Sequence, residues 1–292
     1  MHWLSKKPAF LVMLAPTLLL FTAYVIVPIG IALYYSFTNF TGIGKPDFVG
    51  LSNYKMLLGD KIFYLSLKNT GIVLVLSAVT VIPLSFLLAL LLNRTFPGVK
   101  AAKALNFSPN IIAPILVGLI WVFILDPSMG LINALLRQIG LENLQPEWIG
   151  GRKLTPYAVV LVYLWKVLGY NATIFVTAFK TIPDEIYEAA SIDGASGMKK
   201  IWYITLPMIR STVVVVVLLL ITGVFKIFEI VVQLTGGGPN HLSEMVVTYM
   251  YYMTFQCTKY GYGMSIAIVA FLITAIFAFL YIYFTKESIG EE

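Results

Sequence analysis

Long apolar stretches alternate with shorter polar segments along this chain. Six stretches contain about 20 or more mainly apolar residues, the length that a helix needs to cross the hydrocarbon core of a bilayer. Runs of this length predict membrane-spanning helices. The pattern therefore predicts an all-α integral membrane protein with six transmembrane helices in a single domain over residues 1–292. The expected spans lie at about 10–37, 71–92, 105–125, 157–179, 212–234 and 263–284.

One alternative for the first stretch is a cleaved secretion signal, since Lys6 and Lys7 precede it. A signal peptide has an apolar core of only about 7–15 residues, and this stretch is longer. We therefore expect a retained first helix. Positive charge directly before the first helix favours a cytoplasmic N-terminus. Six spans then place both termini in the cytoplasm.

Composition narrows the class of protein further. Hydrophobic residues make up 59% of the chain and charged residues 12%, against about 25% charged in ordinary soluble domains. This composition excludes a disordered chain and disfavours a soluble enzyme. One cysteine and two histidines offer little for a metal centre, so no metal site is expected. The net charge of +6 fits loops beside anionic lipid better than a nucleic-acid surface.

The polar segment 180–207, between the fourth and fifth stretches, predicts a helical hairpin. Thr181 is a candidate N-cap, Pro183 suits the opening turn, and the two acidic residues after it suit the positive end of the helix dipole. Gly194 is suited to end this helix in a left-handed conformation. A second short helix is expected to follow, and Pro207 is expected to begin the fifth transmembrane helix.

This hairpin has two interpretations. A helix that lies on lipid usually carries Lys and Arg on its polar face, whereas a docking helix matches the charge of its partner protein. The first helix carries four acidic side chains, which anionic lipid would repel. They are Asp184, Glu185, Glu188 and Asp193. Their charge favours a protein partner with basic groups.

The hairpin carries an ordered set of residues that resembles, spacing included, the EAA loop of ATP-binding-cassette importer permeases. The set is Glu188-Ala189-Ala190, Gly194 after three residues, Ile204 after nine more, and Leu206-Pro207 after one more. Three further segments, 48–54, 187–195 and the Leu-Thr-Gly-Gly-Gly-Pro run at 234–239, are similar to permeases of the carbohydrate-importer family, of the maltose, multiple-sugar and glycerol-3-phosphate type. The resemblance covers nearly the whole chain.

The resemblance implies a mechanical role for the hairpin. In this family it is a coupling helix that sits in a cleft on a cytoplasmic ATPase subunit, where Glu188 would meet a basic group and Gly194 would form the turn. The residues that the resemblance assigns to this coupling are Glu188, Ala189, Ala190, Asp193, Gly194, Ile204, Leu206 and Pro207.

The resemblance also implies an assembly in a bacterial or archaeal inner membrane. The expected partners are a second homologous permease subunit, two cytoplasmic ATPase subunits and an extracytoplasmic solute-binding protein. The chain has no GxxxxGK[ST] phosphate loop, whose backbone would cradle the phosphates of ATP. ATP and Mg²⁺ are therefore expected on the ATPase subunits, and this chain is expected to be neither an enzyme nor a cofactor-binding protein.

Ionisable residues inside the apolar stretches are candidates for a substrate path, because each costs about 2.5–3.5 kcal/mol at mid-membrane on insertion scales. Lys226 and Glu229 are three residues apart and are expected to share a helix face. Lys166 lies among aromatic and amide side chains, a mixture that suits the hydroxyls and ring faces of a sugar. The structural alternatives are an interhelical salt bridge for Lys226 and Glu229, and snorkelling to the interface for Lys166.

The family resemblance places sugar contacts in the middle of spans three to five. Together with the ionisable residues, it gives the candidate path residues Asn110, Tyr163, Lys166, Tyr170, Asn171, Lys226 and Glu229. Two lysines depart from the amide and aromatic pattern of the family, which leaves an acidic or more polar sugar open.

The predicted function is half of the translocation path of an ATP-driven, binding-protein-dependent importer for a sugar or oligosaccharide. The lysines keep open the same architecture with glycerol 3-phosphate or another polar solute. An ion-driven secondary transporter would show inverted halves and intramembrane carboxylates, and Glu229 is the one acidic residue deep in a stretch. The charged fifth stretch disfavours a scaffold without transport.

Overall fold

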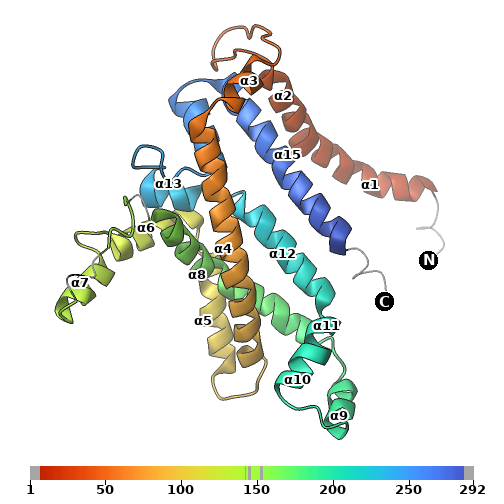
Figure 1. Cartoon of the computed structure of the whole chain (residues 1–292). Coiled ribbons are helices and arrows are strands. Elements are labelled where there is room, and N and C mark those ends of the chain that lie inside the picture. Colours follow the sequence, from red (N-terminus) through yellow and green to blue (C-terminus); the bar gives the residue numbers. More distant parts are fainter. Residues whose placement is uncertain (1–6, 142, 144–145, 152–153, 286–292) are drawn as a thin grey trace. The chain divides into compact units, whose positions relative to one another are not determined.

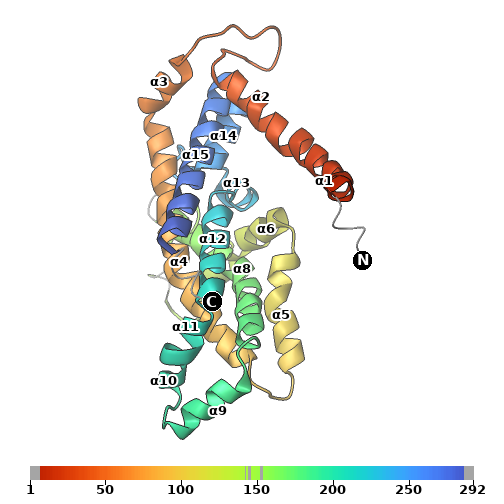
Figure 2. The ribbon, with the colours of Figure 1, turned by 90° about the vertical axis from the view of Figure 1, so that its right-hand side faces the viewer.

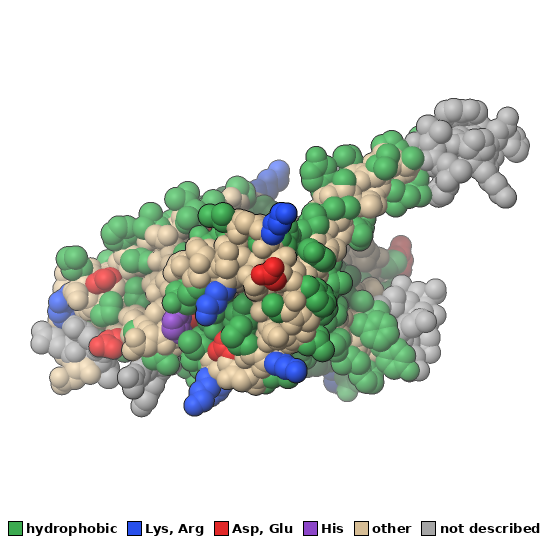
Figure 3. Space-filling view, turned by 90° about the horizontal axis from the view of Figure 1, so that it is seen from above, with side chains coloured by type: hydrophobic (Ala, Val, Ile, Leu, Met, Phe, Trp, Pro, Cys, Tyr) green, Lys and Arg blue, Asp and Glu red, His purple; other side chains and the backbone are tan. Residues whose placement is uncertain are grey.

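The computed structural model describes residues 7–141, 143, 146–151 and 154–285. These residues are mostly helical, and the β pairing recorded among them is an isolated bridge between Thr38 and Phe48. The all-α class is therefore confirmed. Hydrophobic side chains cover much of the face in Figure 3, as expected of a chain whose surface meets lipid tails.

The chain divides into two compact units. The first consists of Met1–Lys61 and Met250–Leu272, and the second of Ile62–Tyr249 and Ile273–Glu292. The candidate path and the hairpin both belong to the second unit.

The first unit begins with a long apolar helix in three consecutive parts, α1 (Lys7–Phe21), the π-helical turn η1 (Thr22–Ile26) and α2 (Val27–Ser36). The π turn comes directly before Pro28, which has no N–H for a regular helical hydrogen bond. The wider turn lets the helix continue through this proline. The segment matches the first predicted span, 10–37.

A loop and the short helix α3 (Ser52–Leu58) follow. The buried side-chain amide of Asn53 donates to two carbonyls at the end of α2, at 2.8 Å each, and so holds α3 against that helix. The long helix α15 (Tyr260–Thr285) starts in the same unit, where the N–H of Gly261 donates to the carbonyl of Phe40 over 2.8 Å. α15 contains the last predicted span.

The second unit is organised around α8 (Thr155–Phe179), which contacts α5, α6, α12 and α13. The helix contributes Val162 to one buried apolar cluster and Phe175 to another, and both side chains are fully buried. The long helix α4 (Lys61–Leu92) packs its buried face into the same clusters. Figures 1 and 2 show these helices from two sides.

The third predicted span is not one continuous helix. α5 (Val99–Ile111) and α6 (Pro114–Leu125) are separated by two extended residues, and their axes differ by 100°. The cause is Pro114, because proline disfavours the helical conformation of the residue before it. Ala113 accordingly has ψ 135°. The predicted span 105–125 therefore consists of two half-helices that meet at an elbow, Ile112 and Ala113.

The fifth predicted span is also divided. α12 (Arg210–Val224) ends before a non-helical segment that includes Phe228, and α13 (Glu229–Thr235) follows. No glycine or proline lies in the break between Val224 and Glu229. α13 packs closely on α6, where a Cβ added to Gly118 would lie 2.7 Å from Gln233. The prediction of one helix over 212–234 was therefore wrong.

Within the part of the chain that the structure describes, four helices are long and apolar enough to span a membrane, at Met13–Ser36, Lys61–Leu92, Thr155–Phe179 and Tyr260–Thr285. Two bent pairs, α5 with α6 and Met198–Met208 with α12, raise the number to six if each pair counts as one span. The remaining short helices are α7 (Leu131–Gln138), α9 (Asp184–Ile192), α10 (Met198–Lys200), η3 (Ile201–Thr205), α11 (Leu206–Met208), α14 (Val246–Tyr251) and η4 (Tyr252–Gln256).

Candidate functional site

The first helix of the hairpin, α9, starts with Pro183 at the N-cap and two acids, Asp184 and Glu185, in its first turn. The acids face the positive end of the helix dipole, as predicted. Thr181 does not cap the helix; its hydroxyl donates to the carbonyl of Ala178 over 2.8 Å. The predicted cap was wrong because the chain leaves α8 and enters α9 through a tight turn that already satisfies this hydroxyl.

The hairpin turns at Gly194, whose φ of +77° confirms the predicted left-handed conformation. The N–H of Gly194 donates to the carbonyl of Ser191 (3.2 Å), and that of Ala195 to the carbonyl of Ala190 (2.8 Å). This pair of bonds is a Schellman motif, which satisfies carbonyls that the helix end leaves open. The end of α9 is therefore fixed by its own backbone.

Side chains join the two arms of the hairpin. The hydroxyls of Tyr187 and Thr205 lie 3.0 Å apart, and the ammonium of Lys200 donates to the carbonyl of Tyr187 over 3.0 Å and to the Ser191 hydroxyl. Thr205 is buried in this contact. These contacts therefore hold the two arms of the hairpin together.

The outward surface of the hairpin is acidic and apolar. Glu188, Ala189 and Asp193 are exposed, whereas Ala190 is buried. Large apolar side chains are also exposed on this hairpin, which is typical of an interaction surface. They are Ile192 (87%), Met198 (65%), Trp202 (59%) and Tyr203 (80%).

The second arm leads into α12. Ile204 and Leu206 are half-buried and Pro207 is exposed. Pro207 lies in the short helix α11 and does not begin α12, which starts at Arg210 after a bend of 72°. The bend falls at Ile209, whose backbone leaves the helical region at φ −100° and ψ 17°. Figures 1 and 2 place the hairpin at the end of the second unit that lies away from α13.

Lys166 of α8 reaches the elbow between α5 and α6. Its ammonium donates to the carbonyls of Asn110 (3.2 Å) and Ile112 (2.9 Å). Two of the predicted path residues, Asn110 and Lys166, are therefore brought together by α5 and α8.

The other predicted path residues on α8 differ in exposure. Tyr163 is 8% exposed. Its hydroxyl packs against Gly223 of α12, where an added Cβ would lie only 2.4 Å from the hydroxyl oxygen. Asn171 is 5% exposed and donates to the carbonyl of Val167 one turn earlier. Tyr170 is 36% exposed and lies near the ring of Phe107, with 6.3 Å between centroids.

Lys226 and Glu229 do not share a helix face, contrary to the prediction. Lys226 lies in the break after α12, whereas Glu229 is the first residue of α13. Both side chains are exposed. Their spacing of three residues predicts a shared face only within a continuous helix, and the break removes that condition.

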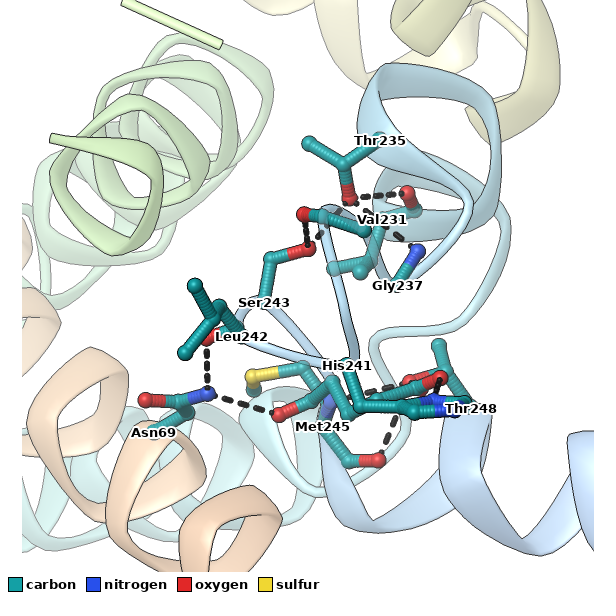
Figure 4. Close-up of polar contacts among 11 residues, drawn as sticks. Asn69, Val231, Thr235, Gly237, His241, Leu242, Ser243, Met245 and Thr248 are labelled. Carbon is teal, nitrogen blue, oxygen red and sulfur yellow. Dashed lines mark hydrogen bonds and ion pairs between the residues drawn. The ribbon is translucent and has the colours of Figure 1, made fainter. Parts of the chain in front are cut away.

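The loop that joins α13 to α14 is held by a network of polar contacts, which the sequence analysis did not predict (Figure 4). The side-chain amide of Asn69 on α4 donates to the carbonyls of Leu242 (2.9 Å) and Glu244 (3.0 Å). The hydroxyl of Ser243 donates to the carbonyl of Gly238 over 2.6 Å and lies 2.8 Å from the hydroxyl of Thr235. The loop is thus held on α4 and on the end of α13.

Glu244 is the buried centre of this loop, with 2% exposure. Its carboxylate accepts a hydrogen bond from the hydroxyl of Thr248 and lies 3.1 Å from Nδ1 of His241. Gly237, at φ +81°, approaches so closely that a Cβ would lie 2.3 Å from the carboxylate. The Gly-Gly-Gly-Pro run signals a turn, but no local pattern signals that Glu244 is buried.

Among the described residues, no group of three or more His, Cys, Asp or Glu side chains is placed to hold a metal ion. The charged groups in the helix breaks and the exposed hairpin are instead features of a membrane transport protein, in which irregular backbone lines a path.

Residues 82–287 match the family described as "Binding-protein-dependent transport system inner membrane component". The chain belongs to this family. It is therefore a transport permease and an inner membrane component.

Two curated relatives align over most of their length. The probable ABC transporter permease protein YurN of Bacillus subtilis is 32% identical, with 94% of each chain covered. The diacetylchitobiose uptake system permease protein NgcF of Streptomyces coelicolor is 29% identical, with 97% of this chain and 84% of the relative covered.

A crystal structure with the same fold is that of a bacterial ABC transporter involved in the import of the acidic polysaccharide alginate. A chain of that transporter is 24% identical to this one, with 97% of each chain covered and a TM-score of 0.85. The two chains therefore share one fold over nearly their whole length.

Proposed function

We propose that this binding-protein-dependent permease forms half of the translocation path of an ATP-driven importer for a sugar or oligosaccharide. The observation that carries the proposal is the hairpin, which exposes acids and large apolar side chains such as Trp202 and Tyr203. Exposed apolar surface beside charge suits a protein partner. The partner of this surface is an ATPase subunit, which supplies the energy that this chain does not generate.

The hairpin is built to transmit movement. Its arms are held together by the contact of Tyr187 with Thr205 and by Lys200, so it moves as one body. Its second arm enters α12 through the single bend at Ile209. A displacement of the hairpin by a closing ATPase pair would therefore displace α12, which contacts α8 and leads to the break beside the candidate path.

Glu188 is the proposed electrostatic contact with the ATPase, and Asp193 and Gly194 form the turn that presents it. Ala189 lies exposed beside Glu188, so a close approach of the partner is possible there. The proposed contribution of Ala190, Ile204 and Leu206 is to fill the inside of the hairpin, while Pro207 lies at its junction with the membrane.

A saccharide suits the path because its hydroxyls and ring faces call for amides, charged groups and aromatic rings together. The curated relative NgcF is named for diacetylchitobiose uptake, and the solved relative for alginate import. Both names describe saccharides, which supports a saccharide as the substrate of this chain. They differ in charge, so the names leave the particular sugar open.

The path between two permease subunits must be lined by side chains that each subunit leaves accessible. Of the candidates, Tyr170, Lys226 and Glu229 are exposed and Asn110 is half-buried. We assign the substrate contacts to these four. Tyr163 and Asn171 are buried by their own subunit and are assigned to packing.

The proposed assembly contains a second homologous permease, two ATPase subunits that bind ATP and Mg²⁺, and an extracytoplasmic solute-binding protein. The turn after α4, near Arg94, lies at the same end of the second unit as the hairpin (Figures 1 and 2). Lys100 and Lys103 follow in α5. Positive residues favour the cytoplasmic side, so this end is proposed to be cytoplasmic, together with both termini.

Affinity purification of the tagged chain from its native membrane tests this assembly. The account expects one homologous permease and an ATPase subunit to co-purify, with ATP hydrolysis that rises when the ligand-loaded binding protein is added. Recovery of the chain alone, with an uptake activity of its own in liposomes, would overturn the proposal.

A further inference from the structure

We propose that Lys166 is a positioning residue of the path, which closes the elbow between α5 and α6 through two backbone carbonyls, and that it is not a cation for an acidic substrate. The inference rests on the proposed function only in calling this region a substrate path. The contacts themselves belong to the fold of this chain.

The elbow creates a need for hydrogen-bond donors. α5 ends at Ile111, and the next two residues are extended, so the last carbonyls of the helix have no partner within it. In a membrane no bulk water replaces such partners, and each open carbonyl is costly. The ammonium of Lys166 meets the need at the carbonyls of Asn110 and Ile112.

The charge of Lys166 also suits this place. The C-terminal end of a helix carries partial negative charge, so a cation there is stabilising. An ammonium group has three donors, and the two carbonyls use two of them.

The elbow that Lys166 closes leads into α6. α6 packs against α13 and α8, so movement of α6 would alter the surroundings of the ammonium group.

The approach of α8 to α5 leaves this side chain little freedom. One turn along from Lys166, a Cβ added to Gly169 would lie 1.8 Å from the carbonyl oxygen of Asn106. Such close packing fixes the distance between the two helices. Lys166 is thus held at the elbow by the helix that carries it, rather than by its own flexible stem.

This assignment changes the expected substrate. Two lysines, Lys166 and Lys226, keep an acidic sugar or a phosphate open on sequence grounds. Lys166 is engaged by two backbone carbonyls, whereas Lys226 lies exposed in the break after α12. Discrimination between neutral and acidic substrates does not depend on Lys166.

Thiol labelling of the elbow tests the proposal independently of transport. Ala113 lies exposed in the break, so Ala113→Cys in a Cys257→Ser background reports elbow opening through its maleimide labelling rate in the purified, reconstituted complex. Lys166→Met is expected to raise this rate about tenfold, because the carbonyls lose charge-assisted hydrogen bonds. Lys226→Met makes the same chemical change outside the network and is expected to leave the rate within twofold.

Two further variants keep the test decisive. Lys166→Arg retains the cation and its donors and is expected to keep the labelling rate within threefold of the parent. If Lys166→Met does not assemble, Lys166→Gln, whose amide still donates, takes its place and is expected to raise the rate about threefold. Equal labelling in the parent, in the assembled Lys166 variants and in Lys226→Met would overturn the positioning role, and that result would leave the proposed function standing.

Discussion

Gly194 shows how one residue controls the geometry of the hairpin. Its φ is +77°, and a Cβ there would meet no atom within 4 Å. The need for glycine is therefore conformational and not steric. For a residue with a Cβ, the left-handed conformation costs roughly 1–2 kcal/mol. A substitution that shifts this conformation would also weaken the Schellman hydrogen bonds at the end of α9.

Gly194→Ala is expected to lower substrate-stimulated ATP hydrolysis by the assembled transporter several-fold, because the hairpin no longer presents one fixed surface. Gly140→Ala is the matched control: Gly140 has φ +74°, also meets no atom within 4 Å, and lies outside the hairpin. Equal loss of coupling in both variants would show that the effect is one of general stability.

Substitution of Glu188 tests whether the negative charge of the docking surface contributes to binding of the ATPase subunit. Glu188→Lys is expected to reduce uptake about tenfold or more, because a broken charge pair at an interface costs about 2–5 kcal/mol. Glu188→Gln keeps the shape and removes the charge, so a smaller loss is expected. The measurement is uptake together with the amount of ATPase subunit that co-purifies. Normal values for both in Glu188→Lys would refute the docking role.

At the scale of elements, the sequence predicts long helices well and their interruptions poorly. The length of an apolar run determines whether a helix spans the membrane, and α4, α8 and α15 follow from it. Pro114 marks the first break in local sequence. The break before α13 has no glycine or proline to signal it, and the packing of α13 on α6 joins segments about 100 residues apart.

In the candidate site, too, local features could be predicted from the sequence and contacts between distant segments could not. The hairpin is encoded by contiguous residues with capping and turn signals, so its ends could be located. The contact of Lys166 with the carbonyls of Asn110 and Ile112 joins positions more than 50 residues apart. Only the folded elbow shows that this lysine has backbone partners.

The packing of α5 on α8 gives a prediction at this scale. Gly169→Ala is expected to destabilise the complex by about 1–3 kcal/mol, because the added Cβ presses on the backbone of Asn106 and forces the helices apart. Gly71→Ala in α4 is the control, since its Cβ meets nothing within 4 Å and alanine favours a helix. The measurement is thermal inactivation of the purified complex. Equal stability of the two variants would contradict the close approach.

At the scale of the whole molecule, the chain is one component of a transport system. It contributes apolar helices for the bilayer, two broken helices that bring charge and open backbone to one region, and a hairpin that exposes a docking surface. Family membership makes it a component of binding-protein-dependent transport. The energy and the delivery of substrate are proposed to come from other subunits.

The most direct test of this account is uptake into proteoliposomes that contain the complete complex purified through this chain. The external binding protein is supplied with its co-purified sugar in radiolabelled form. We expect uptake that requires ATP on the side of the membrane where the hairpin lies and that does not respond to a sodium or proton gradient. Uptake driven by an ion gradient without ATP would contradict it.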